Sequence, residues 1–194
     1  MTSTRPRVGL QRPGGRTERV RRTVAEAVLS FIQERRLDFS YNDVAERSGV
    51  HKTTLYRRWP QRMDLINEAL TEHNATLKIP RGGNWHETAA LLVTSLAEFL
   101  SDPTEIAINC ILFGDTSTHP PLLPSEYWSP VNEALKQVLM SAQQRDELPR
   151  QLDPQALLTM IMGPLLITTL MTREPIPQQQ VDQLITILRA LGQP

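Results

Sequence analysis

Apolar residues recur at helical spacing along most of the chain. The first stripe follows residue 15 and consists of Val20, Val24, Ala27, Val28 and Phe31. Residues three, four and seven apart share one face of an α-helix, so this stripe predicts an amphipathic helix, which Thr17 would cap. Similar stripes predict longer helices over residues 85–100, 104–113, 125–142, 154–172 and 178–191.

Proline and glycine separate these stripes, and no segment alternates apolar and polar residues as a half-buried strand does. Breaks fall at Asp102-Pro103, in the segment THPPLLP, at Leu148-Pro149 and at Glu174-Pro175. Gly163-Pro164 lies inside an apolar stripe, where we expect a kink and not a helix end. The pattern therefore predicts an all-α chain of about nine helices.

Two short helices are predicted between residues 40 and 60. Ser40 followed by Asp43 resembles a capping box, and Gly49 is suited to the left-handed turn that ends a helix. The next helix would begin near His51 and stop before Pro60, which cannot continue it. Two short helices joined by a glycine-containing turn predict a helix-turn-helix.

Changes in composition divide the chain into three parts. Residues 1–15 hold three arginines without apolar periodicity and predict a flexible basic arm. Residues 16–80 form the predicted helix-turn-helix domain. The segment Ile79-Pro80-Arg81-Gly82-Gly83 marks the joint to residues 81–194.

The net charge of zero conceals an asymmetry. Residues 1–80 carry 15 Lys and Arg against 9 Asp and Glu, which leaves 6 against 12 for residues 81–194. A basic segment attached to an acidic one is typical of a nucleic-acid-binding part joined to a part with another task.

The stretch SGVHKTTLYRRWP carries the most informative chemistry. On a helix from His51, Leu55 and Trp59 share the face that packs inward. Lys52, Thr53 and neighbouring polar residues project outward near the amino end, which is the end that a recognition helix presents to bases. Lysine and arginine read guanine, and threonine offers a hydroxyl together with a methyl group that suits thymine.

The segment DVAERSGVHKTTLYRRWPQRMDLI resembles the DNA-binding domain of the tetracycline-repressor-like (TetR) family of bacterial transcription regulators, and the likeness extends from about Arg16 to Leu70. It departs from the family pattern at the recognition-helix cap, which is His51 here. Trp59 replaces the more common Phe, and Arg62 replaces the usual lysine. The resemblance implies base contacts from Asn42, Lys52, Thr53, Thr54 and Arg57, and phosphate contacts from Tyr41, Tyr56 and Arg62.

For residues 81–194 the resemblance implies a body that binds an effector and dimerises. The segments 154–172 and 178–191 are apolar over more of their circumference than a surface helix needs, so we expect Leu158, Leu165, Leu184 and Leu188 at a dimer interface. Burial in the chain's own core is the alternative. Candidates for the lining of a largely apolar ligand pocket are Trp85, Leu96, Phe99, Cys110, Phe113, Trp128, Leu139 and Met162, although such residues also build ordinary cores.

Nothing in the sequence indicates an enzyme, a cofactor or a metal site. The four histidines are scattered, and the single cysteine, Cys110, lies in an apolar run without a nearby histidine. With one cysteine, no secretory leader and no apolar run approaching the length of a membrane span, we expect a cytoplasmic protein.

We therefore expect a homodimeric repressor that binds a pseudo-palindromic double-stranded DNA operator and is released by a small apolar ligand. One alternative is a DNA-binding regulator whose body binds a protein partner or no effector. A second is an all-α enzyme or ligand carrier with an incidental helix-turn-helix. The sequence does not distinguish repression from activation.

Overall fold

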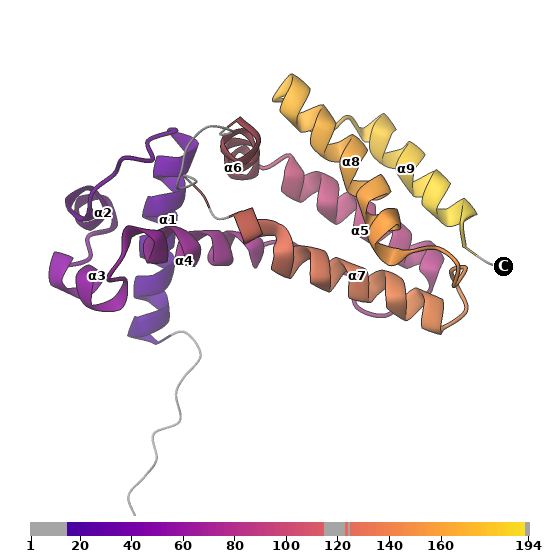
Figure 1. The fold of residues 1–194 in the computed structure, drawn as a ribbon, viewed down its shortest axis with the longest axis horizontal. Helices are drawn as coiled ribbons and strands as arrows, with labels where there is room; N and C mark the ends of the chain where they lie inside the picture. The colour runs from indigo at the N-terminus through magenta and orange to yellow at the C-terminus, as the bar shows by residue number, and fades with distance from the viewer. Residues whose placement is uncertain (1–14, 115–122, 124, 193–194) are drawn as a thin grey trace, which may run out of the picture.

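The computed structural model describes residues 15–114, 123 and 125–192, and within these ranges the chain folds into nine α-helices and one 3-10 helix, without a strand. The all-α prediction is confirmed. Figure 1 shows α1 to α4 gathered at one end of an elongated molecule and α5, α7, α8 and α9 running along the other. We call the first group the head and the helices from α5 onward the body.

The head is built as its sequence predicts. Its helices are α1 (Arg16–Gln33), α2 (Tyr41–Ser48), α3 (Lys52–Arg58) and α4 (Arg62–Asn74). The expectation that Thr17 caps α1 is wrong, because the helix starts one residue before it. The carbonyl of Gly15 accepts the first-turn N–H groups of Glu18 and Arg19.

The body helices also lie close to their predicted ranges. They are α5 (Trp85–Leu100), α6 (Pro103–Gly114), η1 (Ser125–Trp128), α7 (Ser129–Gln144), α8 (Pro154–Thr172) and α9 (Gln178–Ala190). The predicted helix over 125–142 is split, with a short 3-10 turn preceding α7. Helix α8 continues through Pro164, as expected from its apolar stripe.

Two hydrophobic cores underlie this shape. The body core contains buried side chains of α5, α7, α8 and α9. The head core contains buried residues of α1 to α4, and it also includes Ala107 and Ile108 of α6, Leu123, and Tyr127 of η1. Helix α6 lies across the joint, packed against α1 (Figure 1), so it shares the core of the head although it follows the predicted boundary at residue 80.

Helix α8 is apolar over a greater length than we predicted from the sequence. Its 19 residues are long and apolar enough to cross a membrane by length and composition alone, which contradicts the expectation that no run approaches that length. Core helices of soluble proteins pass the same test, and α8 packs against α5, α6 and α7. Only 28% of its most apolar stretch is buried within the chain, however.

Candidate nucleic-acid interface

The turn that joins α2 and α3 has the local chemistry that its sequence predicts. The hydroxyl of Ser40 accepts the N–H of Asp43 at 3.3 Å, and the Asp43 carboxylate accepts the N–H of Ser40 at 2.7 Å, which completes the capping box. The hydrogen bonds from Ser40 lower the pKa of Asp43. Gly49 ends α2 with φ 66°, in the left-handed region that favours glycine.

Helix α3 follows this turn and is held by apolar side chains on one face. Leu55 is fully buried, and Trp59, which follows the last residue of the helix, is 5% exposed. Both belong to the head core, as the sequence predicts. His51 precedes the helix but does not cap its backbone; its Nδ1 lies 3.0 Å from the Thr53 hydroxyl.

The other face of α3 carries the predicted DNA-contacting side chains. Lys52, Thr53, Tyr56 and Arg57 are exposed, whereas Thr54 is half-buried. A hollow of about 490 Å³ separates α3 from the start of α1 and is lined by Thr17, Val20, Gly49, Val50, His51, Thr54, Arg57 and Arg58. The helix therefore presents two threonines and a row of cations on the side away from its core.

Helix α2 contains two of the predicted DNA-contacting residues, Tyr41 and Asn42, and their surroundings differ. Asn42 is exposed in the first turn of α2. The hydroxyl of Tyr41 donates a hydrogen bond to the Trp59 carbonyl at 2.5 Å, and burial raises the pKa of Tyr41. A phosphate oxygen only accepts hydrogen bonds, so a phosphate contact from Tyr41 would have to replace this bond.

Tyr56 and Arg62 keep positions consistent with phosphate contacts. The ring of Tyr56 stacks on that of Tyr41 with centroids 4.1 Å apart, and Tyr56 is 47% exposed. Arg62 is the first residue of α4, and its guanidinium lies 5.3 Å from the centroid of the Phe39 ring. At the amino end of α4, the Asp64 carboxylate accepts the N–H of Gln61 at 2.8 Å, and the N–H of Asp64 donates to the Gln61 carbonyl at 3.0 Å.

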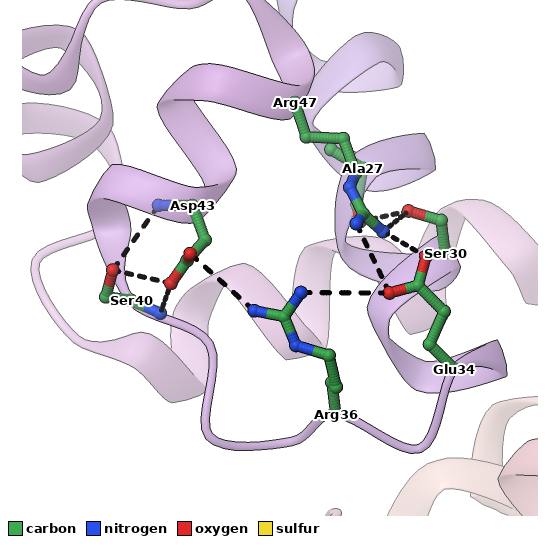
Figure 2. Close-up of polar contacts among 7 residues, drawn as sticks. All are labelled: Ala27, Ser30, Glu34, Arg36, Ser40, Asp43 and Arg47. Carbon is green, nitrogen blue, oxygen red and sulfur yellow. Dashed lines mark hydrogen bonds and ion pairs between the residues drawn. The ribbon is translucent and has the colours of Figure 1, made fainter.

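Two other arginines of the head are used internally, as Figure 2 shows. Arg47 of α2 lies 2.6 Å from the Glu34 carboxylate, donates to Ser30, and covers the face of Phe31 at 3.8 Å. The hydrogen bond from Arg47 lowers the pKa of Glu34. Arg36 lies between Glu34, at 3.9 Å, and Asp43, at 3.6 Å. This network ties α2 to the end of α1.

Arg36 and Arg47 are paired with carboxylates of the head, whereas the cations near α3 are not. Among the described residues, no carboxylate forms an ion pair with Lys52, Arg57, Arg58 or Arg62. The positive charge on α3 and the start of α4 is therefore left without an ion pair among the described residues. This surface is suited to a polyanion.

The predicted pocket residues do not share one position in the body. Trp85, Leu96, Phe99 and Leu139 are buried in cores, while Cys110, Trp128 and Met162 are half-buried. Phe113 is 56% exposed, at the end of α6. Among the described residues there is also a cavity of about 410 Å³, whose lining the sequence did not predict. It is lined by Ile79, Pro80, Arg81, Gly82, Thr88, Ala134, Gln137, Val138, Ser141 and Arg145.

The structure places the predicted dimer residues mainly in the core of the single chain. Leu158, Leu165 and Leu188 are buried in the body core, and Leu184 is half-buried. When a helix is apolar on all sides, its sequence does not show which side packs against its own chain. The leucines predicted from the sequence lie mostly on the side that does. The large apolar residues exposed on α8 and α9 are Met160, Ile167, Met171 and Ile187, which we call the outer apolar face.

A buried polar cluster at the joint of head and body also escaped sequence reasoning. The Glu105 carboxylate of α6 is fully buried and accepts hydrogen bonds from Tyr127 at 2.6 Å and from Asn109 at 2.7 Å. His73 of α4 places Nε2 at 3.1 Å from Glu105, and the Trp128 indole donates to Asn109. His73, Glu105 and Tyr127 are far apart in sequence, so no local motif predicts the cluster.

Comparison with known proteins places this geometry in context. A family model described as "Tetracyclin repressor-like, C-terminal domain" matches residues 79–188. The chain is 29% identical over 193 residues to the HTH-type transcriptional regulator AqdR of Rhodococcus erythropolis, covering 94% of this chain and 92% of the relative. It is 24% identical to the uncharacterized HTH-type transcriptional regulator YdeS of Bacillus subtilis, over 88% of each.

Solved structures share the fold. The regulator tylp of Streptomyces fradiae superposes with a TM-score of 0.70 at 17% identity, covering 92% of this chain and 88% of that one. A TetR-family regulator structure from Mesorhizobium loti gives a TM-score of 0.69 at 15% identity, over 92% and 98% of the two chains. At these identities the likeness is one of fold.

Proposed function

Because the chain belongs to the TetR family of helix-turn-helix transcriptional regulators, we propose that it is a homodimeric, ligand-responsive repressor that reads its operator with helix α3. This is a family of transcriptional regulators and not of enzymes. The observation that carries the proposal is the exposed set of Lys52, Thr53 and Arg57 on α3, with the half-buried Arg62 at the start of α4, none of whose cations forms an ion pair with a described carboxylate. Since an operator is chromosomal DNA, we expect the protein in the cytoplasm.

Base reading would come from Lys52, Thr53 and Arg57, with Asn42 and Thr54 beside them. Lys52, Thr53 and Thr54 lie in the first turn of α3, Arg57 in its last turn, and Asn42 in the first turn of α2. A helix presented in this way fits the major groove, where each base pair shows a distinct pattern of donors and acceptors. Tyr56 and Arg62 would hold phosphates on either side.

Dimerisation would use the outer apolar face. Helix α8 leaves Met160, Ile167 and Met171 exposed in its own chain, and Ile187 adds an exposed apolar residue on α9. An exposed apolar patch of this kind on two neighbouring helices is suited to a second copy related by a two-fold axis. Two heads would then read half-sites about 34–36 Å apart, one turn of DNA, or a multiple of it.

An effector would act by favouring an arrangement of the two heads that no longer fits DNA. This requires that the ligand bind the two arrangements with different affinity, worth about 1–3 kcal/mol of coupling. The cavity between residues 79–82 and α7 is lined partly by the segment that connects α4 to α5, so a ligand there would contact that segment. Its mixture of apolar walls with threonine, glutamine, serine and arginine suits an amphipathic ligand better than a purely apolar one.

The first test is selection of genomic DNA fragments by the purified protein at about 150 mM salt, an ionic strength at which weak phosphate contacts are screened. Enrichment of a pseudo-palindrome is the expected result. Binding without a preferred sequence, lost as salt rises, would reduce the head to a basic surface and contradict the proposal. Operator binding by a body that takes up no small molecule would favour the alternative of a protein partner or no effector.

A further inference from the structure

The carboxyl end of the recognition helix, α3, is fixed by polar contacts. Because α3 is short, its orientation depends on them. Helix α3 has seven residues, Lys52–Arg58, and packs chiefly against α2. A helix of two turns is marginal by itself, so its orientation depends on tertiary anchors. The residue that follows it, Trp59, is its link to the rest of the head.

Trp59 is bound from two sides. Its carbonyl accepts the Tyr41 hydroxyl of α2, and its indole N–H donates to the Glu68 carboxylate of α4 at 3.1 Å. The ring is 5% exposed and belongs to the head core. A phenylalanine at this position would fill the same apolar site but would have no N–H to offer Glu68.

Glu68 in turn joins two further helices. Its other carboxylate oxygen accepts from Arg21 of α1, with Nε at 2.8 Å and Nη2 at 2.6 Å. Two N–H groups of Arg21 thus converge on one oxygen of Glu68, whose side chain is only 18% exposed, so this is a charge-assisted and partly desolvated ion pair. Arg21 also lies 3.3 Å from Glu72, one turn further along α4. Helices α1 and α4 are thereby connected to the end of α3 through one carboxylate.

We propose that Glu68 is a positioning residue for DNA recognition. One oxygen of its carboxylate binds the Trp59 indole and the other binds Arg21, and this link sets the angle at which α3 presents Lys52, Thr53 and Arg57 to the bases. This inference rests on the proposed DNA-binding function. Because Glu68 and Trp59 lie on the core side of the head, their effect on DNA is indirect.

Two substitutions remove the contact from opposite sides. Trp59→Phe deletes the donor without changing the charge of the head. Glu68→Gln keeps the shape of the acceptor, but an amide satisfies only one of its two neighbours, because its NH₂ group must face either the indole N–H or the guanidinium. The probe is the duplex that the wild-type protein enriches from random-sequence DNA, with a scrambled duplex of equal length beside it.

Each variant is expected to bind the enriched duplex about threefold to tenfold more weakly, the range that corresponds to the net contribution of one typical hydrogen bond, with unchanged affinity for the scrambled duplex. The double variant should lose little more than either single one, because both remove the same contact. Thermal unfolding followed by circular dichroism shows whether each head is folded. If Trp59→Phe fails to fold, Glu68→Gln carries the test.

The matched control is Glu72→Gln, which removes the same charge from the same helix beside the same arginine but does not touch Trp59. It should leave the ratio of specific to non-specific affinity within about twofold, since Glu72 makes only one longer contact with Arg21, at 3.3 Å, and no hydrogen bond to Trp59. An equal loss in Glu72→Gln and Glu68→Gln, or equal losses on both duplexes, would overturn the positioning role. If the wild-type protein enriches no sequence, the proposed function fails instead, so the two failures are distinguishable.

Discussion

Individual side chains in the head show how residue type and partner together decide a role. Arg47 and Arg62 are both arginines of the helix-turn-helix region, yet the guanidinium of Arg47 is paired with Glu34, while Arg62 has no carboxylate partner among the described residues. The guanidinium of Arg47 thus orients α2, as Figure 2 shows, while that of Arg62 is available for DNA.

Arg62→Ala is therefore expected to weaken binding to all DNA sequences and to reduce the slope of log affinity against log salt by about one, because one phosphate contact is lost. The slope is measured by titrating DNA at several salt concentrations. Arg173→Gln, an exposed arginine of the body, serves as the control and should leave the slope unchanged. Identical slopes in wild type and Arg62→Ala would rule out the assigned docking.

Tyr127 gives a prediction about pH. Burial, together with the carboxylate of Glu105, raises the pKa of Tyr127 above its usual range. A tyrosine in the unfolded chain loses its proton near pH 10, so the unfolded state binds fewer protons above that pH and the stability contributed below it is lost as pH rises. The free energy of unfolding should fall above about pH 10, with Tyr127 contributing up to about 1.4 kcal/mol per pH unit.

Tyr127→Phe should make this alkaline decline shallower while lowering stability at neutral pH, since Glu105 loses one donor. Urea unfolding at pH 7 to 11 measures both effects at fixed protein concentration. The cause assigned to the decline is wrong if both proteins lose stability equally steeply above pH 10.

At the scale of the elements, short local features determine where helices begin and end, while distant contacts determine how they meet. The turn between α2 and α3 depends on Gly49, whose positive φ an alanine adopts only at a cost. A Cβ at this position would meet no atom within 4 Å, so the cost is backbone strain without a clash.

Gly49→Ala is expected to lower the free energy of unfolding by about 1 kcal/mol. Gly49→Asn should cost less, because asparagine tolerates the left-handed conformation better than alanine. Chemical denaturation of both variants measures the difference. Equal stability of Gly49→Ala and wild type would show that the turn adjusts without strain.

The contact between α4 and α6 depends instead on the buried Glu105 cluster. Glu105→Leu leaves the donors of His73, Asn109 and Tyr127 without their acceptor, and we expect a loss of about 3–5 kcal/mol. Glu98→Leu, an exposed glutamate of α5, should change stability by less than about 0.5 kcal/mol. If Glu105→Leu proved neutral, the cluster would not be what joins head to body.

For the whole molecule, the outer apolar face of α8 and α9 is the surface that we propose for dimerisation. Met160, Ile167, Met171 and Ile187 are 57% to 80% exposed in the single chain. A residue exposed in the folded chain tolerates a charge there, whereas the same charge within an interface must be desolvated.

Ile167→Glu should therefore leave each chain folded but raise the dimer dissociation constant at least about tenfold, as for loss of a central apolar contact. Sedimentation velocity at several protein concentrations measures this change. Met140→Glu places the same charge on α7, at an apolar residue outside this face, and should leave the dimer intact. A dimer that both variants leave unaffected would have to use another surface.

The sequence by itself determined the helical class, most helix ends and the helix-turn-helix. These follow from interactions between neighbours in the chain: the Ser40–Asp43 box, the glycine at position 49, the proline at position 60 and the apolar stripes. The fold could be predicted because such signals are local and repeat at the period of the helix.

Only the tertiary structure decided which face of an apolar helix turns inward and which polar groups meet. Leu165 and Ile167 are equally plausible interface residues in the sequence, but packing against the body buries the first and exposes the second. Likewise the Tyr41 hydroxyl meets the Trp59 carbonyl, and Glu105 meets His73, across 18 and 32 residues of chain. Periodicity fixes the spacing of side chains along one helix, and contacts between helices depend on how all of them pack together.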